Sequence, residues 1–479
     1  MLDKRQFYIN GQWVAPAKAH DLEVINPSTE EPCAVISLGG KADTDAAVAA
    51  ARAAFEPWMM TPPAKRLALI EKLLEVYNRR ADDMAAAISM EMGAPIDMSK
   101  QQQVTTGSWH ISNFIKAFKD FQFTKKLGDH APNDRILLEP IGVVGMITPW
   151  NWPMNQIALK AIPAMATGCT MILKPSEIAP LSGMLFAEMV DEAGFPKGVF
   201  NLVNGDGLGV GTQLSGHLDV DMISFTGSTR AGTAIQKNAA DTVKRVSLEL
   251  GGKGANIIFA DADEKAVARG VLRCMNNTGQ SCNAPTRMLV QRPVYDAAVE
   301  TAAAAANKIT VGHSDEAGRH IGPVVSEAQW NKIQGLIEVG IKEGARLVAG
   351  GPGRPEGLNC GYFVRPTVFA DANNQMTIAR EEIFGPVLTI IPFDTEDEAI
   401  EIANDTPYGL TNYVQTQDNE KGARVTRRLR SGMVEMNGTS RGAGSPFGGY
   451  KMSGNGREGG VWGLEDYLEV KAVSGWAAE

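Results

Sequence analysis

The feature that most constrains the fold is a repeated alternation of short apolar runs with longer helical stretches. Apolar runs occupy residues 143–147, 170–173, 199–203 and 222–225, and a stretch with helical periodicity at 181–192 lies between two of them. Strands that are buried on both faces read as continuous apolar runs, and their alternation with helices is typical of a parallel sheet covered by helices. The predicted fold class is therefore α/β.

The same alternation starts again after Gly251-Gly252. Strands are predicted at 256–259, 286–291, 387–392 and 432–436, and helices at 264–276, 294–306 and 396–404. A chain of 479 residues is too long for one ordinary hydrophobic core. We therefore expect two α/β domains with a boundary near these two glycines.

The N-terminal part and the tail depart from this alternation. We expect a hairpin at 7–14 with Gly11-Gln12 as its turn, a strand at 22–25, and amphipathic helices at 44–55, 63–89 and 105–121. Residues 121–138 are polar and irregular, so we expect them to leave the first domain. The strand-like tail at 464–474 is predicted to pair with another chain.

Charge and cysteine content exclude several classes of protein. The formal net charge of −9 argues against a nucleic-acid-binding surface. No secretory signal and no run of about 18 apolar residues is evident, so we expect a cytoplasmic protein without a membrane span. The five scattered cysteines, Cys33, Cys169, Cys274, Cys282 and Cys360, do not resemble a disulfide framework, and free thiols are expected.

One of these cysteines has a setting that suits catalysis. Cys282 ends the segment Gly279-Gln280-Ser281-Cys282 just before a predicted strand, and Glu249 opens Glu249-Leu250-Gly251-Gly252-Lys253 upstream. A thiol and a carboxylate can supply a nucleophile and a general base. Because free cysteines are usually buried and inert, we interpret the other four that way.

Four loops that follow predicted strands carry candidate binding groups. The glycine-rich stretch 205–211 and the segment Phe225-Thr226-Gly227-Ser228 could hold phosphates at a helix N-terminus, or form ordinary strand-to-helix turns. Lys174-Pro175-Ser176-Glu177 could reach ribose hydroxyls, or be a solvated charged loop. The stiff loop Thr148-Pro149-Trp150-Asn151-Trp152-Pro153 could aim the Asn151 amide at an oxyanion, or be a packed aromatic turn.

In this order along the chain, the motifs resemble those of NAD(P)-dependent aldehyde dehydrogenases. The resemblance covers essentially the whole chain and continues through Glu381-Glu382-Ile383-Phe384-Gly385-Pro386 and Pro446-Phe447-Gly448-Gly449-Tyr450-Lys451. It implies a Rossmann-type NAD-binding domain from residues 1–121 and 141–251 and an α/β catalytic domain from 252–446. A small β oligomerisation arm from 122–140 and 462–479 would form a homo-oligomer, either a dimer or a homotetramer.

The resemblance also implies an activity, the oxidation of an aldehyde to a carboxylic acid with NAD+. Cys282 would attack the aldehyde carbon, and Asn151 with the Cys282 backbone N–H would hold the oxyanion. Hydride would pass to the nicotinamide, and Glu249 would activate the water that hydrolyses the resulting thioester. Lys160 and Glu458 would relay protons, and no metal is implied.

Two sets of contacts follow from the resemblance. The implied cofactor contacts are Thr148, Pro149, Trp150, Lys174, Ser176, Glu177, Gly207, Gly211, Phe225, Thr226, Gly227, Ser228, Leu250, Gly251, Glu382 and Phe384. The implied substrate contacts are Trp109, Trp152, Asn155, Leu159, Ser281, Asn283, Arg441 and Phe447. A carboxylate at Glu177 would repel a 2′-phosphate, so NAD is favoured over NADP. We expect Arg441 either to favour aldehydes with a distal carboxylate or other acceptor, or to face solvent or a neighbouring subunit.

Other functions remain as alternatives. A CoA-acylating semialdehyde dehydrogenase would not need Glu249 to activate water. A non-catalytic structural relative would not need Cys282, Glu249, Asn151 and Glu382 together. A thiol hydrolase would leave the phosphate and ribose motifs without a purpose. Hydrolytic aldehyde oxidation is the function that uses all of these residues.

Overall fold

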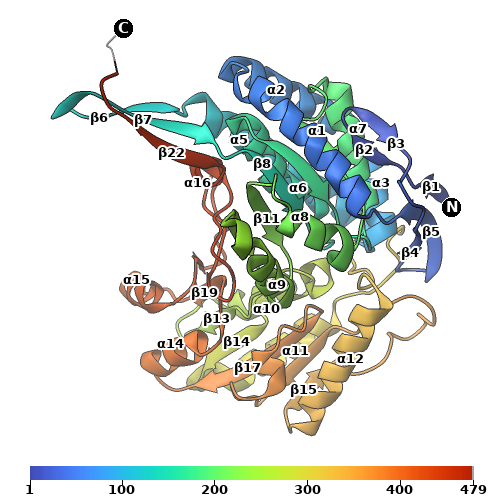
Figure 1. Cartoon of the computed structure of the whole chain (residues 1–479). Helices are drawn as coiled ribbons and strands as arrows, with labels where there is room; N and C mark the ends of the chain where they lie inside the picture. Colours follow the sequence, from blue (N-terminus) through green and yellow to red (C-terminus); the bar gives the residue numbers. More distant parts are fainter. Residues whose placement is uncertain (477–479) are drawn as a thin grey trace.

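The computed structural model describes residues 1–476. It contains two seven-stranded sheets, whose strands come from two successive parts of the chain. Figure 1 shows the first sheet with its helices in blue to green and the second in yellow to red, with a slender three-stranded sheet projecting from the upper half. The predicted α/β class is confirmed, and residues 477–479 of the predicted arm lie outside the described part of the chain.

The first sheet has the strand order β12-β11-β8-β9-β10-β2-β3, and the first five strands in this order are parallel. These are β8 (Val143–Ile147), β9 (Thr170–Lys174), β10 (Phe200–Leu202), β11 (Met222–Thr226) and β12 (Arg245–Glu249). Along the chain, β8, β9 and β10 are added one after another toward one edge of the sheet. The next strand, β11, lies on the other side of β8, so the strand order reverses between β8 and β11. Open α/β sheets bind ligands at the carboxyl ends of the strands at such a switch point.

Helices cover this sheet on both faces. They are α1 (Lys41–Met59), α2 (Pro63–Arg79), α3 (Ala81–Met92), α5 (Val104–Lys119), α6 (Pro153–Thr167), α7 (Leu181–Ala193), α8 (Thr212–Gly216) and α9 (Thr229–Ala239). The single helix predicted at 63–89 is wrong, because the backbone leaves helical geometry at Arg80 (φ −99°, ψ 21°). There the Arg80 guanidinium pairs with Glu188 of α7 at 2.9 Å, which anchors the break to a neighbouring helix.

The second sheet has the order β15-β16-β17-β14-β13-β19-β20 and is parallel except for the edge strand β15. Its strands are β13 (Ala255–Ile258), β14 (Arg287–Gln291), β15 (Arg346–Ala349), β16 (Thr367–Ala370), β17 (Val387–Phe393), β19 (Thr411–Gln415) and β20 (Met433–Met436). The helices that accompany it are α10 (Ala266–Met275), α11 (Tyr295–Asn307), α12 (Glu327–Lys342), α13 (Thr377–Arg380), α14 (Glu396–Asn404) and α15 (Asn419–Arg428).

The projecting sheet consists of β6 (Thr124–Gly128), β7 (Ala131–Pro140) and β22 (Leu468–Val473) in the order β22-β7-β6. The prediction that 121–138 is irregular is wrong, because most of this segment forms a hairpin. Its strands are partly exposed along their length, and their apolar residues are limited to a few positions such as Ile136–Leu138, too few to signal two strands. The tail pairs with β7 of its own chain, where pairing with another chain was predicted. Residues 464–465 belong to α16 (Gly460–Glu465) and not to the strand.

The N-terminus adds short strands to two sheets. β2 (Phe7–Ile9) and β3 (Gln12–Val14) form the predicted hairpin, but the turn is Asn10-Gly11, and both residues have positive φ as a tight hairpin turn requires. A separate sheet contains β1 (Leu2–Lys4), β4 (Asp21–Asn26) and β5 (Glu31–Ser37). The remaining short elements are α4 (Ile96–Met98), β18 (Tyr408–Gly409) and β21 (Tyr450–Lys451). Within residues 1–476, no helix is both long and apolar enough to cross a membrane.

Candidate active site

Two pockets meet at the Cys282 side chain. One opens at the carboxyl ends of β8, β11 and β12, at the switch point of the first sheet. The other lies between α5, α6 and the glycine-rich segment 442–460. Cys282 is the one residue that lines both pockets. A molecule in either pocket could therefore approach its sulfur, and we name them the switch-point pocket and the α5–α6 pocket.

The switch-point pocket contains many of the predicted cofactor residues. Those that line it are Pro149, Trp150, Thr226, Gly227, Ser228, Leu250, Gly251, Glu382 and Phe384. Asn151 also lines it, together with Gln329 and Lys332 of α12, which sequence reasoning missed. These two residues carry no motif, because they are ordinary polar positions on an amphipathic helix.

Several predicted cofactor residues lie outside the lining of the switch-point pocket. They are Thr148, Lys174, Ser176, Glu177, Gly207, Gly211 and Phe225. Lys174 and Glu177 nevertheless follow β9 at the same edge of the sheet, and their side chains form an ion pair at 3.1 Å. The Gly207–Gly211 segment forms a π-helical turn after β10, so it too lies at this edge. The structure therefore places these groups along the carboxyl edge beside the pocket.

The groups in the switch-point pocket suit a nucleotide. The buried Thr226 hydroxyl has no hydrogen-bond partner among the described residues. Glu382 Oε1 accepts a hydrogen bond from the Gly252 N–H at 2.9 Å, which leaves its second oxygen available for a hydroxyl donor. Phe384 has a φ of 59° and meets Trp150 edge to face, with ring centroids 5.4 Å apart. Unpaired hydroxyl and carboxylate oxygens beside aromatic rings fit a ribose with a flat base.

The α5–α6 pocket combines aromatic and polar walls. Of the predicted substrate residues, those that line it are Trp109, Trp152, Asn155, Leu159, Asn283, Arg441 and Phe447. Ser281 does not line it, and its hydroxyl accepts a hydrogen bond from Trp152 Nε1 at 2.8 Å. Sequence reasoning missed His110, which looked like one polar position among many on a helix.

The loop that carries Cys282 has an unusual backbone. Asn277, Thr278 and Gly279 follow one another with φ values of 52°, 56° and 72°. Non-glycine residues rarely adopt this left-handed region, and such strain persists only where the surroundings impose it. At Gly279 a Cβ atom would lie 2.0 Å from the Gly385 carbonyl oxygen, so only glycine fits. The loop is therefore held in one conformation just before the thiol.

A network of buried amides joins this loop to Asn151. Asn277 Nδ2 and Gln103 Nε2 both donate to the Asn151 carbonyl oxygen, at 2.9 and 3.1 Å. Gln103 Nε2 also lies 3.2 Å from Asn277 Oδ1, and Asn151 Nδ2 donates to the Gln280 carbonyl oxygen at 3.0 Å. Gln103 ends a π-helical turn, Ser99–Gln103, a feature frequent at functional sites. One N–H of the Asn151 amide is thus fixed, and the other remains for a ligand.

The thiol and the carboxylates near it influence one another. Burial, with the charges of Glu382 and Glu249 adding to it, raises the pKa of the Cys282 thiol to about 12, while Arg441 opposes the rise. The thiol is therefore protonated at neutral pH and needs a base before it can act as a nucleophile. Of the other cysteines, Cys169 and Cys274 are buried as expected, but the expectation is wrong for half-buried Cys33 and for Cys360, which is exposed in the loop before β16.

Glu249, the last residue of β12, is a suitable base. Its side chain is buried and neither carboxylate oxygen has a hydrogen-bond partner among the described residues. Burial, reinforced by Glu458, raises its pKa well above the ordinary glutamate value. A Cβ at Gly448 would lie 2.7 Å from Glu249 Oε1, so the backbone approaches the carboxylate closely. Glu458 lines the α5–α6 pocket and accepts a hydrogen bond from Lys160 Nζ at 2.5 Å.

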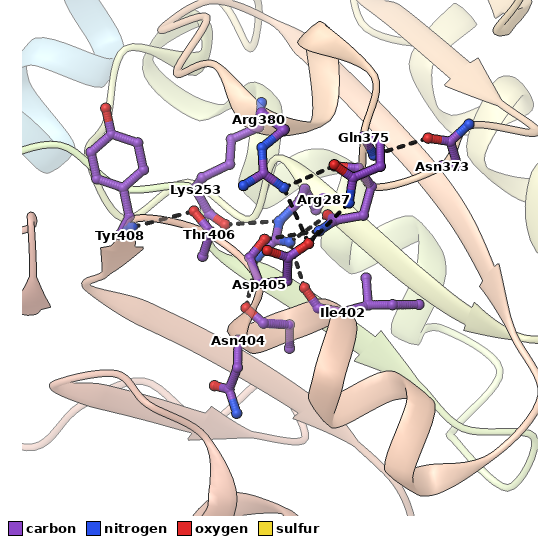
Figure 2. A network of polar contacts seen from close by, with 12 residues as sticks. Lys253, Arg287, Asn373, Gln375, Arg380, Ile402, Asn404, Asp405, Thr406 and Tyr408 are labelled. Atoms are coloured by element: carbon purple, nitrogen blue, oxygen red, sulfur yellow. Dashed lines mark hydrogen bonds and ion pairs between the residues drawn. The ribbon is translucent and has the colours of Figure 1, made fainter.

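A polar cluster around the buried Arg287 supports the segment that leads to Glu382 and is shown in Figure 2. Arg287 donates to the Lys253 carbonyl at 3.0 Å and to Asn374 Oδ1 at 2.8 Å. Asn374 in turn donates to Asp405 Oδ2 at 2.9 Å. The cluster therefore joins the backbone that follows Gly252 to residues 374–380. Burial, with the charge of Arg287 adding to it, lowers the pKa of the unpartnered Lys253 ammonium to about 7.

The comparisons with known proteins agree with this geometry. The aldehyde dehydrogenase family matches residues 13–473 of the chain. A 3-succinoylsemialdehyde-pyridine dehydrogenase from Pseudomonas sp. is 52% identical, with 99% of each chain covered. The crystal structure of an aldehyde dehydrogenase from Bartonella henselae is 61% identical with a TM-score of 0.99, covering 99% of this chain and 100% of that one.

A second solved structure contains ligands. It is a mutant of aldehyde dehydrogenase C from Pseudomonas syringae in complex with NAD+ and octanal, and it is 49% identical with a TM-score of 0.97. The match covers 99% of this chain and 97% of that chain. The match of the family over nearly all residues, and of two solved structures over 97% or more of their length, shows that this chain belongs to the aldehyde dehydrogenase family.

Proposed function

We propose that this NAD-dependent aldehyde dehydrogenase carries out its reaction on the sulfur of Cys282. The observation that carries the proposal is that Cys282 lines both the switch-point pocket and the α5–α6 pocket. A cofactor at the switch point and an aldehyde in the α5–α6 pocket would meet at this side chain. The Cys282 sulfur attacks the aldehyde carbon while Glu249 takes the thiol proton, which forms a thiohemiacetal oxyanion.

Two N–H groups stabilise that oxyanion. One is the backbone N–H of Cys282, and the other is the second N–H of the Asn151 amide, whose first N–H is occupied by the Gln280 carbonyl. A single donor of this kind typically lowers the barrier by about 3–4 kcal/mol. NAD, when bound, accepts the hydride from the thiohemiacetal carbon, which leaves a thioester on Cys282.

Hydrolysis of the thioester completes the reaction. Once the thiol proton has left Glu249, its carboxylate removes a proton from a water molecule, whose oxygen attacks the thioester carbon, and the C–S bond breaks to release the acid and the Cys282 thiolate. A carboxylate with a raised pKa is a stronger base than ordinary glutamate, which suits this task. The proton then leaves Glu249 by way of Glu458 and Lys160, an assignment supported by their buried ion pair.

The cofactor residues are proposed to favour NAD over NADP. Glu177 and Lys174 at the end of β9 would face the adenosine ribose, with Glu382 and Phe384 on the nicotinamide side. A carboxylate accepts a hydrogen bond from a ribose 2′-hydroxyl and repels a 2′-phosphate. Because Lys174 pairs with Glu177, we expect a preference and not an absolute exclusion.

The domain assignment and the oligomeric state are further parts of the proposal. We assign residues 1–121 and 141–251 to NAD binding, 252–446 to catalysis, and 122–140 with 462–479 to an oligomerisation arm. Exposed apolar side chains on or beside the arm support a homo-oligomer, either a dimer or a tetramer: Leu127, Trp462, Val470 and Trp476. The free edges of β22 and β6 also offer unpaired backbone groups. Light scattering of the purified protein tests the oligomeric state.

A cytoplasmic location is also part of the proposal. It is supported by the five cysteines, all of which are free.

An aldehyde panel tests the proposed reaction. Purified protein is assayed for NADH production from straight-chain and aromatic aldehydes, with and without coenzyme A, beside the Cys282→Ser variant. The proposal predicts NADH without coenzyme A, and none from the variant although its NAD binding is retained. A requirement for coenzyme A would favour the acylating alternative, and appreciable NADH from the serine variant would remove Cys282 as the nucleophile.

A further inference from the structure

The α5–α6 pocket has one wall that its proposed chemistry does not use. Arg441 lines this pocket from the glycine-rich loop 437–445. Its guanidinium carbon lies 4.8 Å from the centroid of the Phe447 ring, and its Nε lies 3.4 Å from Glu435 Oε1. Neither of its two terminal amino groups forms a hydrogen bond with a described residue. The planar donor face of this arginine is therefore available beside the pocket.

The charges around Arg441 do not balance. Glu435 is buried and forms ion pairs with both Arg441 and Arg273, so one carboxylate serves two guanidinium groups. Glu458, the acidic residue that lines the pocket, is already paired with Lys160. The α5–α6 pocket is thus left with one positive charge that has no anionic partner of its own.

His110 does not supply a second charge. Burial lowers its pKa to about 4, with Arg441 also lowering it and the hydrogen bond to Asn155 opposing the change. The ring is therefore neutral at pH 7, and its Nε2–H donates to Asn155 Oδ1 at 2.8 Å. This arrangement leaves Nδ1 without a proton. Arg441 alone then presents charged donors to the pocket, between the aromatic walls of Trp109, Trp152 and Phe447.

We propose that Arg441 makes this pocket a subsite for aldehydes whose far end carries a carboxylate or, more weakly, a carbonyl oxygen. The inference rests on the proposed function, because it assigns the distal group of a substrate that reacts at Cys282. A carboxylate would accept two parallel N–H bonds from the free face of the guanidinium and balance its charge. A ketone would accept one such bond, and a methyl group none.

The alternative role for Arg441 is structural. If Arg441 only holds Glu435, or faces solvent with its partly exposed side chain, the far end of the substrate is irrelevant to the rate. An arginine in either of these roles would leave selectivity for the distal group untouched. The two roles therefore predict different effects of the distal group.

The test compares three straight-chain aldehydes of equal length that end in a carboxylate, a methyl ketone or a methyl group. They are assayed with the wild type and with two variants, Arg441→Gln and Arg427→Gln. Arg427 serves as the control, because it is an exposed arginine on α15 that forms no ion pair with a described residue. In the wild type, kcat/KM should fall in the order acid, ketone, methyl, with the acid about tenfold to a hundredfold above the methyl compound. Arg441→Gln should lower kcat/KM for the acid about tenfold to a hundredfold more than for the methyl compound, mainly through KM, whereas Arg427→Gln should change kcat/KM for none of the three.

Two results would overturn the inference. One is a wild type that oxidises the methyl-ended aldehyde at least as well as the acid. The other is an Arg441→Gln variant that slows all three substrates alike. A binding titration of the diacid product against the equally long monoacid, in wild type and Arg441→Gln, does not depend on turnover. Loss of diacid preference in the variant supports the subsite even if the proposed chemistry fails, and equal binding of both acids to the wild type refutes it.

Discussion

Replacement of Glu249 by glutamine separates the two halves of the proposed reaction. Glutamine has nearly the same shape, so it fits the space that the Gly448 backbone leaves beside this side chain. It cannot accept a proton from water, however, and hydrolysis of the thioester should slow. Because Glu249 also takes the thiol proton in the proposed first step, formation of the thioester should slow as well. We therefore expect one NADH per active site to form in a slowed first phase, followed by a still slower steady rate.

The size of the effect follows from the surroundings of Glu249. Neither carboxylate oxygen is engaged by a hydrogen bond among the described residues, so no existing contact weakens it as a base. Its raised pKa makes the carboxylate a stronger base than an ordinary glutamate. A positioned base typically contributes about 10²–10⁴ in rate, which corresponds to about 3–5 kcal/mol. The steady rate of Glu249→Gln should fall by that factor.

The pH dependence of the rate gives a second test of Glu249→Gln. In the wild type, Glu249 acts when deprotonated, so the rate should rise with pH through a pKa above that of ordinary glutamate. In the variant, this limb should disappear. Because the Cys282 pKa is raised to about 12, the thiolate fraction grows as the pH increases toward it. The burst rate of the variant should therefore increase about tenfold per pH unit.

A matched variant on the cofactor side provides the control. Glu382 is also a carboxylate near Cys282, but it lines the switch-point pocket. Glu382→Gln should raise KM for NAD and slow the burst, while hydrolysis of the thioester is preserved. Rapid-mixing measurements of NADH absorbance resolve both phases. An unchanged steady rate in Glu249→Gln, or the same defect in both variants, would refute the division of roles.

Three further substitutions test other parts of the account. Gln103→Ala removes two hydrogen bonds from the amide network, so kcat should fall about tenfold with KM for NAD unchanged, whereas exposed Gln101→Ala should have no effect. Glu177→Gln should raise the ratio of kcat/KM with NADP to that with NAD about tenfold, and an unaltered ratio would show that Glu177 does not face the 2′ position. Lys253→Met should raise the melting temperature below about pH 7, since the lowered folded-state pKa of about 7 makes the buried lysine costly there. That gain should shrink as the pH rises toward the unfolded-state pKa, and a gain independent of pH would contradict this assignment.

The parallel strands of the first sheet could be predicted because they are buried and therefore rich in apolar residues, which the sequence shows directly. All residues of β8 and β11 are buried; β8 contains no polar side chain, and in β11 three apolar residues surround Ser224 before Thr226. β19 is equally buried but has the sequence Thr411-Asn412-Tyr413-Val414-Gln415, which has no apolar run. Its polar side chains find partners only in the folded chain, as when Gln415 donates to Asn256 at 3.0 Å. Local pattern could not reveal this strand.

In the candidate site, too, some residues could be predicted from the sequence and others could not. Cys282 and Glu249 stand in recognisable segments, so they were predicted. Gln103 acts on Asn151 across 48 positions of sequence and on Asn277 across 174, and nothing near it in the chain indicates either contact. His110 looked like a polar residue on a helix until the fold placed it in the α5–α6 pocket. Residues that depend on distant contacts are the ones that sequence reasoning could not identify.

The central claim is that the substrate carbon becomes covalently attached to Cys282. The most direct test is intact-protein and peptide mass spectrometry of Glu249→Gln, quenched in acid after mixing with NAD and an aldehyde. The account predicts an added mass equal to the aldehyde less two hydrogen atoms, on the peptide that contains Cys282. The adduct should be absent without NAD and absent from the Cys282→Ser variant. An active enzyme that forms NADH with no adduct, or with the adduct on another residue, would contradict the account.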